Sequence, residues 1–365
     1  MIGQKGVPAT YGGVEHHVEE LGSRLAARGH QVDVFCRPSY GTPDDGFYRG
    51  MNLRTTRTIG TKHLDAIGHS LVSSFYSAAR PPDIVHYHAL GPVLTSPVVR
   101  ALSSSRVVVT VHGLDHERDK WGRGARLALG LGHWMSARVP HATVVVSREL
   151  QSHYAAEFGR ECVYIPNGVD APMLRSAYEI SRRWGLRRGG FALFVGRLVP
   201  EKSPDLLIRA YRAVPGDLPL VIAGDSSFTD EYVSELRAEA SGDPRVLLCG
   251  YVYGRALAEL YSNAAVFVQP SRLEGMPLTL LEAASYGAPV VASDIPPHRE
   301  IAGEQVAAMH LVPPNDERAL ADRIAEVLAH PEPARADALR RHVLGTFRWD
   351  TAAADLEALY QRLVD

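Results

Sequence analysis

The stretch from residue 264 to residue 293, AAVFVQPSRLEGMPLTLLEAASYGAPVVAS, decides the fold class. Two apolar runs, 264–270 and 288–293, enclose a segment with the pattern of a helix. Short apolar strands that alternate with helices are typical of a parallel sheet joined by crossover helices. We therefore expect an α/β fold around this stretch.

The same alternation extends outward from this stretch and occurs as two series. The apolar runs are 32–36, 83–88, 106–112, 142–147 and 162–166 in the first series, and 191–196, 218–224, 245–250, 264–270 and 288–293 in the second. Between the series, 167–190 contains Pro172, Gly185 and the pair Gly189-Gly190, which is typical of a linker. We predict two doubly wound domains, 1–170 and 171–345, and a final helix within 346–365 that could pack on either domain and complete the first.

The N-terminus departs from the usual pattern of such domains. A doubly wound domain begins with a buried strand that leads into its first glycine loop, yet only Met1 and Ile2 precede Gly3. We expect the first strand to be shortened, and whether the chain is active with this start is left open.

Composition fits a two-domain globular protein and excludes some functions. The chain has 365 residues, of which 45% are hydrophobic and 22% charged, values that are ordinary for globular proteins. The 39 Lys and Arg residues nearly balance the 41 Asp and Glu residues. Because nucleic-acid binding usually needs a broad basic face, we expect no nucleic-acid partner.

Location is predicted from cysteines and hydropathy. The three cysteines have no metal-binding spacing and lie in apolar runs, which indicates buried thiols in a reducing compartment. The sequence shows neither a membrane-spanning run nor a signal peptide, so we expect a cytoplasmic protein. The segment 121–138 mixes Arg with Trp and Leu, as interfacial helices do, which leaves peripheral contact with the inner face of the membrane open beside an ordinary packed helix.

The helix between the two apolar runs has features of a phosphate site. Gly275 lets the backbone approach a ligand closely, Pro277 suits a first helical turn, and the N–H groups around Met276 and Leu278 can bind an anion. Phosphate is the anion that such a helix start commonly binds.

Two glutamates in the same stretch are separated by seven residues. Glu274 can accept hydrogen bonds from sugar hydroxyls, and Glu282, about two turns into the helix, can accept from ribose hydroxyls. Alternatively, they are a helix-capping acid and a surface acid, since this spacing alone is common.

The whole stretch resembles the GT-B glycosyltransferases, in particular the large retaining family-four group, whose hallmark is this pair of glutamates after a strand. The resemblance covers essentially the whole chain. It implies two Rossmann-like domains that face a cleft, a nucleoside-diphosphate-sugar donor on the C-terminal domain and a hydroxyl acceptor on the N-terminal domain.

A second motif, FVGRLVPEKSPDLLIRA (194–210), places Gly196, Arg197 and Lys202 after an apolar run. Open α/β sheets bind ligands at the carboxyl ends of their strands, where these two cations should lie. The resemblance implies that Arg197 and Lys202 clamp the donor diphosphate and stabilise it as it leaves, so that no metal is expected. Alternatively, the motif is a solvated turn in which Glu201 pairs with one cation.

The N-terminal loop, GQKGVPATYGG (3–13), matches neither the dinucleotide-binding fingerprint nor the P-loop of nucleoside triphosphatases. The resemblance implies that Gly12 and Gly13 approach the donor phosphate and sugar, with Tyr11, Glu15 and His16 on the acceptor side. Metal ligation by Glu15, His16 and His17 is disfavoured because adjacent helix positions point to different faces.

Further positions take roles only through the resemblance. His112, after the run RVVVTV, is implied to border the donor sugar, although a lone histidine at this place is more often a capping or core residue. Asp115 is a candidate for orienting the acceptor. Tyr251 and Val252 are implied to hold the nucleotide base, largely through their backbone.

The implied reaction is a front-face displacement with retention, in which Arg197, Lys202, Glu274 and His112 form the catalytic group, although a double displacement would leave the same motifs. The stretches 3–21 and 112–122 look most like bacterial exopolysaccharide and O-antigen transferases, several of them rhamnosyl, which favours a saccharide or polyprenyl-linked acceptor. His116 departs from the aromatic residue expected there, which weakens the donor assignment. A nucleotide-sugar epimerase of the same architecture and an inactive binding homologue are the alternatives.

Overall fold

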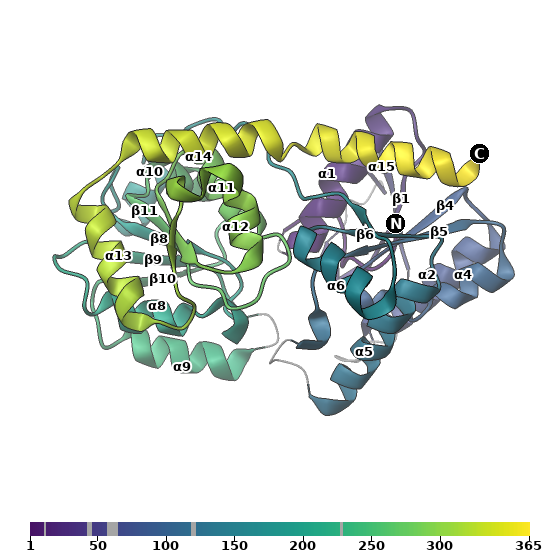
Figure 1. Cartoon of the computed structure of the whole chain (residues 1–365), viewed down its shortest axis with the longest axis horizontal. Helices are drawn as coiled ribbons and strands as arrows, with labels where there is room; N and C mark the ends of the chain where they lie inside the picture. The colour runs from purple at the N-terminus through teal and green to yellow at the C-terminus, as the bar shows by residue number, and fades with distance from the viewer. Residues whose placement is uncertain (11, 42–45, 57–64, 118–121, 227–228) are drawn as a thin grey trace. The chain divides into compact units, whose positions relative to one another are not determined.

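The chain divides into two compact units in a computed structural model that describes residues 1–10, 12–41, 46–56, 65–117, 122–226 and 229–365. Unit 1 comprises Met1–Gly168 together with Trp349–Asp365, and unit 2 comprises Val169–Arg348 (Figure 1). Each unit combines parallel β-sheet with helices that cover it, so the predicted α/β class with two Rossmann-like domains is confirmed.

Unit 1 contains a four-stranded parallel sheet in the order β4-β5-β6-β7 and a smaller sheet in the order β1-β3-β2. Its strands are β1 (Asp33–Cys36), β2 (Phe47–Tyr48), β3 (Met51–Thr55), β4 (Ile84–His88), β5 (Arg106–Val111), β6 (Ala142–Val145) and β7 (Val163–Tyr164). Its helices are α1 (Gly13–Ala27), α2 (Asp65–Ala79), α3 (Leu90–Val93), α4 (Ser96–Leu102), α5 (Arg123–Arg138), α6 (Arg148–Phe158) and α15 (Trp349–Val364), with short 3₁₀ turns η1 (Pro38–Tyr40) and η2 (Asp115–Glu117).

The first two residues join these two sheets. The backbone N–H of Ile2 donates to His86 (2.9 Å), the N–H of His88 donates to Ile2 (2.8 Å), and the N–H of Phe35 donates to Met1 (3.1 Å). Met1 and Ile2 therefore lie between β1 and β4 and take the place of a very short first strand. Only β2 departs from a parallel arrangement, since among the described strands it alone pairs antiparallel, with β3.

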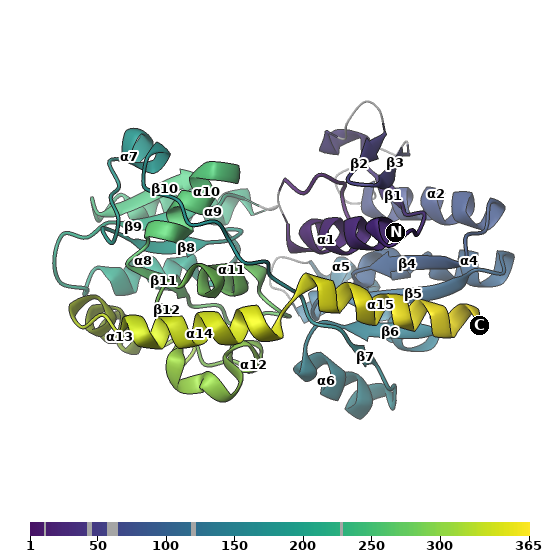
Figure 2. The ribbon, with the colours of Figure 1, turned by 90° about the horizontal axis from the view of Figure 1, so that it is seen from above.

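The last helix, α15, belongs to unit 1 although it follows unit 2 in the chain. It lies beside α1 (Figures 1 and 2). Arg24 pairs with Asp350 at 2.9 Å and Arg28 with Glu357 at 2.8 Å, and the Tyr360 hydroxyl hydrogen-bonds to the buried ring of His86 on β4. The helix therefore covers the sheet of unit 1 through both polar and apolar contacts.

Unit 2 contains one six-stranded parallel sheet in the order β10-β9-β8-β11-β12-β13. Its strands are β8 (Ala192–Val195), β9 (Leu220–Ala223), β10 (Val246–Gly250), β11 (Val266–Gln269), β12 (Val290–Ser293) and β13 (His310–Val312). Its helices are α7 (Glu179–Trp184), α8 (Pro204–Tyr211), α9 (Asp230–Ala240), α10 (Gly254–Asn263), α11 (Leu278–Tyr286), α12 (Pro296–Ala302), α13 (Glu317–Ala329) and α14 (Pro333–Thr346), with 3₁₀ turns η3 (Pro200–Lys202) and η4 (Gly303–Ala308).

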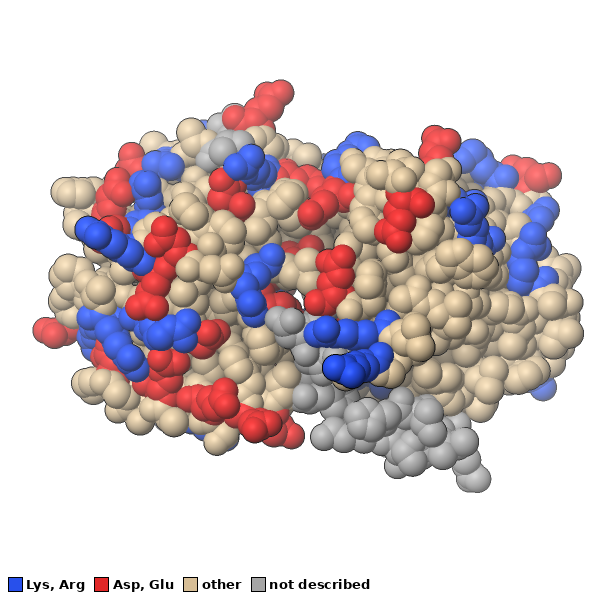
Figure 3. All heavy atoms as spheres, turned by 60° about the horizontal axis from the view of Figure 1, so that its bottom comes forward, with Lys and Arg blue, Asp and Glu red and all other residues tan. Residues whose placement is uncertain are grey.

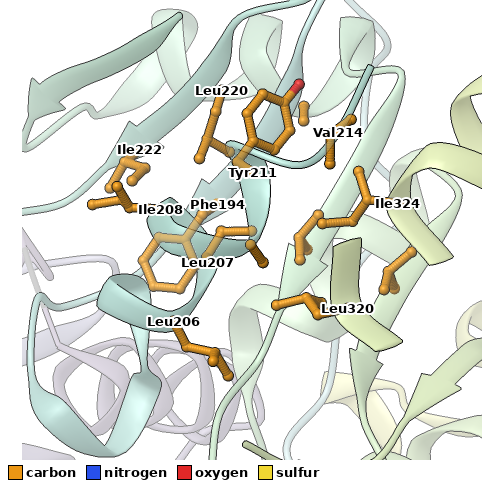
Figure 4. Close-up of a cluster of buried hydrophobic side chains, with 14 of the residues drawn as sticks. Phe194, Leu206, Leu207, Ile208, Tyr211, Val214, Leu220, Ile222, Leu320 and Ile324 are labelled. Atoms are coloured by element: carbon orange, nitrogen blue, oxygen red, sulfur yellow. The ribbon is translucent and has the colours of Figure 1, made fainter. Parts of the chain in front are cut away.

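The core of unit 2 lies between the sheet and helices α8 and α13 (Figure 4). Strands β9, β11 and β12 are buried along their whole length, which explains why their sequences are continuous apolar runs rather than alternating ones. Burial of each large apolar side chain here contributes about 1.5–3 kcal/mol. The core side chains drawn in Figure 4 include Phe194, Leu206, Leu207, Ile208, Tyr211, Leu220, Ile222, Leu320 and Ile324.

The segment predicted as a linker, 167–190, contains structure of its own. Helix α7 forms within it and packs on α10, and the Glu259 carboxylate accepts hydrogen bonds from the first-turn N–H groups of Glu179 and Ile180.

Among the described residues, no helix is both long enough and apolar enough to cross a membrane.

Candidate active site

The strand order of unit 2 creates a place where the connections that leave two neighbouring strands run in opposite directions. In chain order the strands of the sheet are third, second, first, fourth, fifth and sixth, so the direction of winding reverses between β8 and β11. Open α/β sheets bind ligands at this reversal, outside the carboxyl ends of the strands. The loops that follow β8 and β11 contain Arg197, Lys202 and Glu274.

Lys202 and Glu274 contact each other at this place. The Lys202 ammonium lies 2.7 Å from Oε1 of Glu274, and the two side chains are only 12% and 11% exposed. The amide of Gln269 and the hydroxyl of Ser271 donate to the same oxygen, at 2.9 and 2.8 Å. The carboxylate is therefore held in one position by three donors.

The environment keeps the Glu274 carboxylate ionised. Burial raises its pKa, but the Lys202 ammonium and the Ser271 hydroxyl act in the opposite direction and lower the pKa to about 2. His298 on α12 is fully buried nearby, and burial lowers its pKa to about 4, so that its ring is neutral at pH 7. Nδ1 of His298 bonds to the carbonyl of Ser293 (2.7 Å), and its Nε2 has no hydrogen-bond partner among the described residues.

Helix α11 begins at the same edge of the sheet. It starts at Leu278, one residue later than the sequence suggests, because Pro277 has an extended backbone (ψ 110°) and forms the N-cap. Proline offers no side-chain acceptor to the N–H groups of the first turn, so these groups and the helix dipole are available to an anion. Gly275 and Met276, which lead into the helix, are buried.

Glu282 lies about one turn into α11, rather than the two turns expected from the sequence, because the helix begins only at Leu278. It is half-buried. Its carboxylate accepts a hydrogen bond of 2.9 Å from the hydroxyl of Tyr261, which is itself buried on α10. This contact fixes one oxygen of Glu282. A role with ribose hydroxyls stays a prediction.

The loops after β9 and β10 form a neighbouring surface. Tyr251 is 37% exposed and donates to the carbonyl of Ser226 (2.7 Å). Its ring stacks on that of Tyr253 with an interplanar angle of 18°, and Val252 between them is buried.

Gly196 and Arg197, in the loop after β8, are half-buried. Gly224 allows a close approach there, because a Cβ on it would lie 1.8 Å from the Gly196 carbonyl oxygen.

In unit 1 the glycine-rich loop is held by the helix that follows it. Gly12 has φ 104°, and a Cβ on it would lie 2.0 Å from Oε2 of Glu15, so this position requires glycine. The buried Glu15 carboxylate accepts from the N–H of Lys5 (2.9 Å). Glu15 therefore positions the loop, Gly13 opens α1, and an acceptor-side role for Glu15 is a prediction.

His112 follows β5 and lies in a cluster of histidines. Its ring makes an edge contact with His17 from α1 (ring centroids 4.6 Å apart), and Nδ1 of His88 lies 3.4 Å from its Nε2. His17 and His88 are buried, and burial lowers the pKa of both, to about 4 for His17. One ring nitrogen from each of the three residues falls within 4.8 Å of the others, a spacing that could hold a metal ion.

The remaining predicted acceptor-side residues are spread over unit 1. His16 is half-buried and its ring makes an edge contact with Trp349 of α15. Asp115 is half-buried in η2. Tyr11 and Trp121 lie outside the described residues.

Two sequence-family models match this chain. Residues 11–171 match the model described as Glycosyltransferase Family 4, and residues 179–341 match the model described as Glycosyl transferases group 1. A D-inositol 3-phosphate glycosyltransferase of Geodermatophilus obscurus is 31% identical over 96% of this chain and 84% of its own length. This chain belongs to the family-four glycosyltransferases of GT-B type.

Other relatives of this glycosyltransferase differ in their stated substrates. A GDP-mannose-dependent alpha-(1-6)-phosphatidylinositol monomannoside mannosyltransferase of Mycobacterium tuberculosis is 28% identical over 96% of this chain and 94% of its own length. Among solved structures, sucrose-phosphate synthase of Thermosynechococcus elongatus has a TM-score of 0.82 at 23% identity, with 100% of this chain and 97% of that one covered. Anabaena HepE in complex with UDP-glucose has a TM-score of 0.81 at 16% identity, with 98% of each chain covered.

Sequence reasoning on this glycosyltransferase assigned no role to three side chains around Glu274. Gln269 and Ser271 donate to the carboxylate, and His298 lies close enough to influence its pKa. Gln269 left a signal, because it is a polar residue inside the apolar run AAVFVQP. His298 left none, because it comes from α12, the third element after the loop that contains Glu274.

Proposed function

We propose that this glycosyltransferase is a retaining enzyme that transfers a sugar from a nucleoside-diphosphate-sugar donor to a hydroxyl acceptor. The observation that carries the proposal is the arrangement between β8 and β11, where the loop with Arg197 and Lys202, the held Glu274 carboxylate and the start of α11 meet at one sheet edge. A dianionic diphosphate needs cations and N–H donors, and a sugar needs a fixed acceptor for its hydroxyls.

In the proposed reaction the bond between the anomeric carbon and the diphosphate oxygen breaks while the acceptor oxygen arrives on the same face. Arg197, Lys202 and the N–H groups at the start of α11 stabilise the negative charge that develops on the leaving diphosphate. The leaving phosphate takes the acceptor proton. Glu274 orients the sugar, and a contact of His112 with the sugar stays a prediction. Because side-chain cations neutralise the leaving group, the transfer step needs no metal ion.

The geometry of Lys202 and Glu274 adds a detail to this proposal. In the structure Lys202 is engaged with Glu274, so a donor phosphate would share the ammonium with the carboxylate. An ammonium has three donors, which is enough to bind both groups at once. Lys202 would then link the sugar-binding carboxylate to the leaving diphosphate.

The nucleotide would lie over the loops after β9 and β10, with Glu282 at the ribose. Exposed Tyr251, stacked on Tyr253, offers an aromatic surface to the base. Relatives and structural neighbours are named for GDP-mannose, UDP-glucose and ADP. The base and the sugar, including the rhamnosyl donor favoured by the sequence resemblance, therefore need a direct test.

The acceptor is proposed to be a growing surface glycan or a lipid-linked saccharide at the inner face of the membrane. The support comes from α5, which exposes Leu127, Leu131 and Trp134 at 79%, 52% and 51%. These residues are spaced along one helix face, and exposed Arg123 and Arg138 at the two ends of the helix can contact anionic headgroups. The chain would bind the membrane peripherally from the cytoplasm.

A donor screen tests the proposed function. The purified chain is incubated with UDP-, GDP- and dTDP-sugars, dTDP-rhamnose included, with saccharide and polyprenyl-linked acceptors and with EDTA present. The expected result is release of nucleoside diphosphate that depends on the acceptor, with a product of the same anomeric configuration as the donor by NMR. Sugar conversion without an acceptor would indicate an epimerase, and nucleotide binding without turnover would indicate an inactive homologue.

A further inference from the structure

A second cluster of metal-ligating side chains lies in unit 1, on elements other than those that hold His112. His133 is on α5, and His153 and Glu157 are on α6, which packs against α5. His153 and Glu157 are four residues apart and therefore share one face of their helix. One ligand atom from each of the three side chains lies within 4.8 Å of the other two.

The distances are close to those around a bound transition metal. Nε2 of His133 lies 3.2 Å from Nε2 of His153, and Nε2 of His153 lies 2.8 Å from Oε2 of Glu157. Two ligands at the usual zinc distances of about 2.0–2.1 Å in a tetrahedral arrangement lie about 3.3 Å apart. The histidine pair already has this separation, and the carboxylate oxygen lies within 4.8 Å of both ring nitrogens.

The three ligand atoms lie close to one another. Nε2 of His153 is within hydrogen-bonding distance of both Nε2 of His133 and the Glu157 carboxylate. The three side chains therefore form one compact set of ligands, which a single cation can contact.

The cluster is also accessible and partly held in place. His153 and Glu157 are 28% and 47% exposed, so that an ion can enter from solvent. His133 is buried, and the ring of His116 stacks on it with centroids 4.6 Å apart. One ligand is therefore fixed by packing while the other two can adjust.

We propose that His133, His153 and Glu157 form a zinc site in unit 1, with water completing the coordination. Two imidazoles and one carboxylate suit Zn²⁺, whereas Mg²⁺ and Ca²⁺ prefer oxygen ligands. The ion links α5 to α6 and takes no part in the transfer step. It stabilises unit 1 and holds the helix that exposes Leu127 and Trp134.

Calorimetric titration of the chelator-treated full chain with ZnCl₂ tests this site. One ion should bind per chain, and MgCl₂ should give no binding. Mutation of a residue that only supports a metal ligand lowers metal affinity by about 10–100-fold. Loss of a ligand itself should therefore lower the zinc affinity by at least about 100-fold in His153→Ala. The zinc affinity of Glu157→Gln should also fall strongly. Glu157 is exposed and His153 is partly exposed, and neither belongs to the buried core, so these variants should fold. His330→Ala, which removes an exposed histidine from unit 2, is the matched control and should bind zinc like the wild type.

A second variant separates this site from the cluster of His17, His88 and His112. His112→Ala should keep the zinc affinity of the wild type. If His112→Ala abolished binding while His153→Ala left it unchanged, the proposed site would be wrong. A saturating amount of zinc should also raise the melting temperature of the wild type by a few degrees and leave that of His153→Ala unchanged, and an equal rise in both would contradict the proposal.

Discussion

Lys202 and Glu274 meet although they are 72 residues apart in the sequence. The ion pair is nearly buried, and removal of one partner from such a pair leaves the other charge without compensation, which is destabilising. The pair is also the point where the proposed diphosphate and sugar sites join. A change at Lys202 should therefore affect both turnover and stability, and the two effects can be measured separately.

Lys202→Met should lower kcat by about 10²–10³-fold, because the leaving diphosphate loses a cation that stabilises it in the transition state. The chain should also lose up to about 3 kcal/mol of unfolding free energy, because Glu274 keeps a nearly buried charge. Turnover is measured on folded protein, checked by circular dichroism. Lys202→Arg should recover part of the activity, and Arg318→Met, at a side chain that is 93% exposed on α13, should change neither quantity. A near wild-type kcat in Lys202→Met would exclude the proposed role of Lys202 in stabilising the leaving diphosphate.

The pH dependence of stability should report the same contact. The folded-state pKa of Glu274 is about 2, below the ordinary glutamate value of 4.5, so its ionisation stabilises the fold above about pH 4.5 and this contribution is lost as pH falls toward 2. The shift corresponds to roughly 3 kcal/mol, of which roughly 2 kcal/mol should be lost between pH 4.5 and 3. Urea unfolding at pH 6 and pH 3 should show a larger loss in the wild type than in Lys202→Met. Equal losses would show that Lys202 does not set this pKa.

At the scale of elements, local sequence predicts strands well and long-range contacts poorly. The runs at 83–88, 106–112 and 142–147 became β4, β5 and β6 within one or two residues, because buried parallel strands need continuous apolar side chains. The loops with Arg197 and Glu274 were also identified from the sequence. Their direct contact depends on the strand order, which no local pattern contains, and the same is true of His298.

The position of α15 is a further example of a long-range contact. Its apolar spacing predicted a helix but not which unit it covers, since an apolar stripe fits many surfaces. The choice is made by polar partners far away in sequence, such as Arg24 with Asp350 and His86 with Tyr360. These contacts hold α15 on unit 1.

Tyr360→Phe should destabilise unit 1 by about 1–3 kcal/mol, because Nδ1 of the buried His86 ring loses its partner. The effect is measured as the unfolding free energy from urea titration. Tyr178→Phe, at a 57% exposed tyrosine of unit 2, is the control and should stay within about 0.5 kcal/mol of the wild type. The same small value for Tyr360→Phe would mean that α15 is held by its apolar face and surface ion pairs alone.

At the scale of the whole molecule, the two units divide the proposed tasks. The cations, Glu274 and the uncapped start of α11 are in unit 2, whereas the glycine-rich loop, the histidine cluster and α5 are in unit 1. The net charge of the chain is close to zero, so overall charge does not attract the chain to a membrane. Membrane binding must therefore come from a local surface, apolar or basic. The visible face of unit 1, at the right in Figure 3, has a broad area with few charged side chains.

Vesicle binding should therefore depend on the apolar face of α5. Burial of a leucine contributes about 1.5–3 kcal/mol, so Leu127→Ser and Leu131→Ser should each weaken binding to anionic lipid vesicles by about tenfold or more, as measured by co-sedimentation. Arg123→Gln should have a smaller effect, about fivefold, that disappears at high salt, because one basic residue near an anionic surface contributes about 1 kcal/mol. Leu102→Ser changes a leucine on α4 whose exposure, 62%, lies between those of Leu127 and Leu131, and it should bind like the wild type. If the α5 and α4 variants bound equally well, the apolar face of α5 would need another partner, and the acceptor would not be presented through membrane contact at this helix.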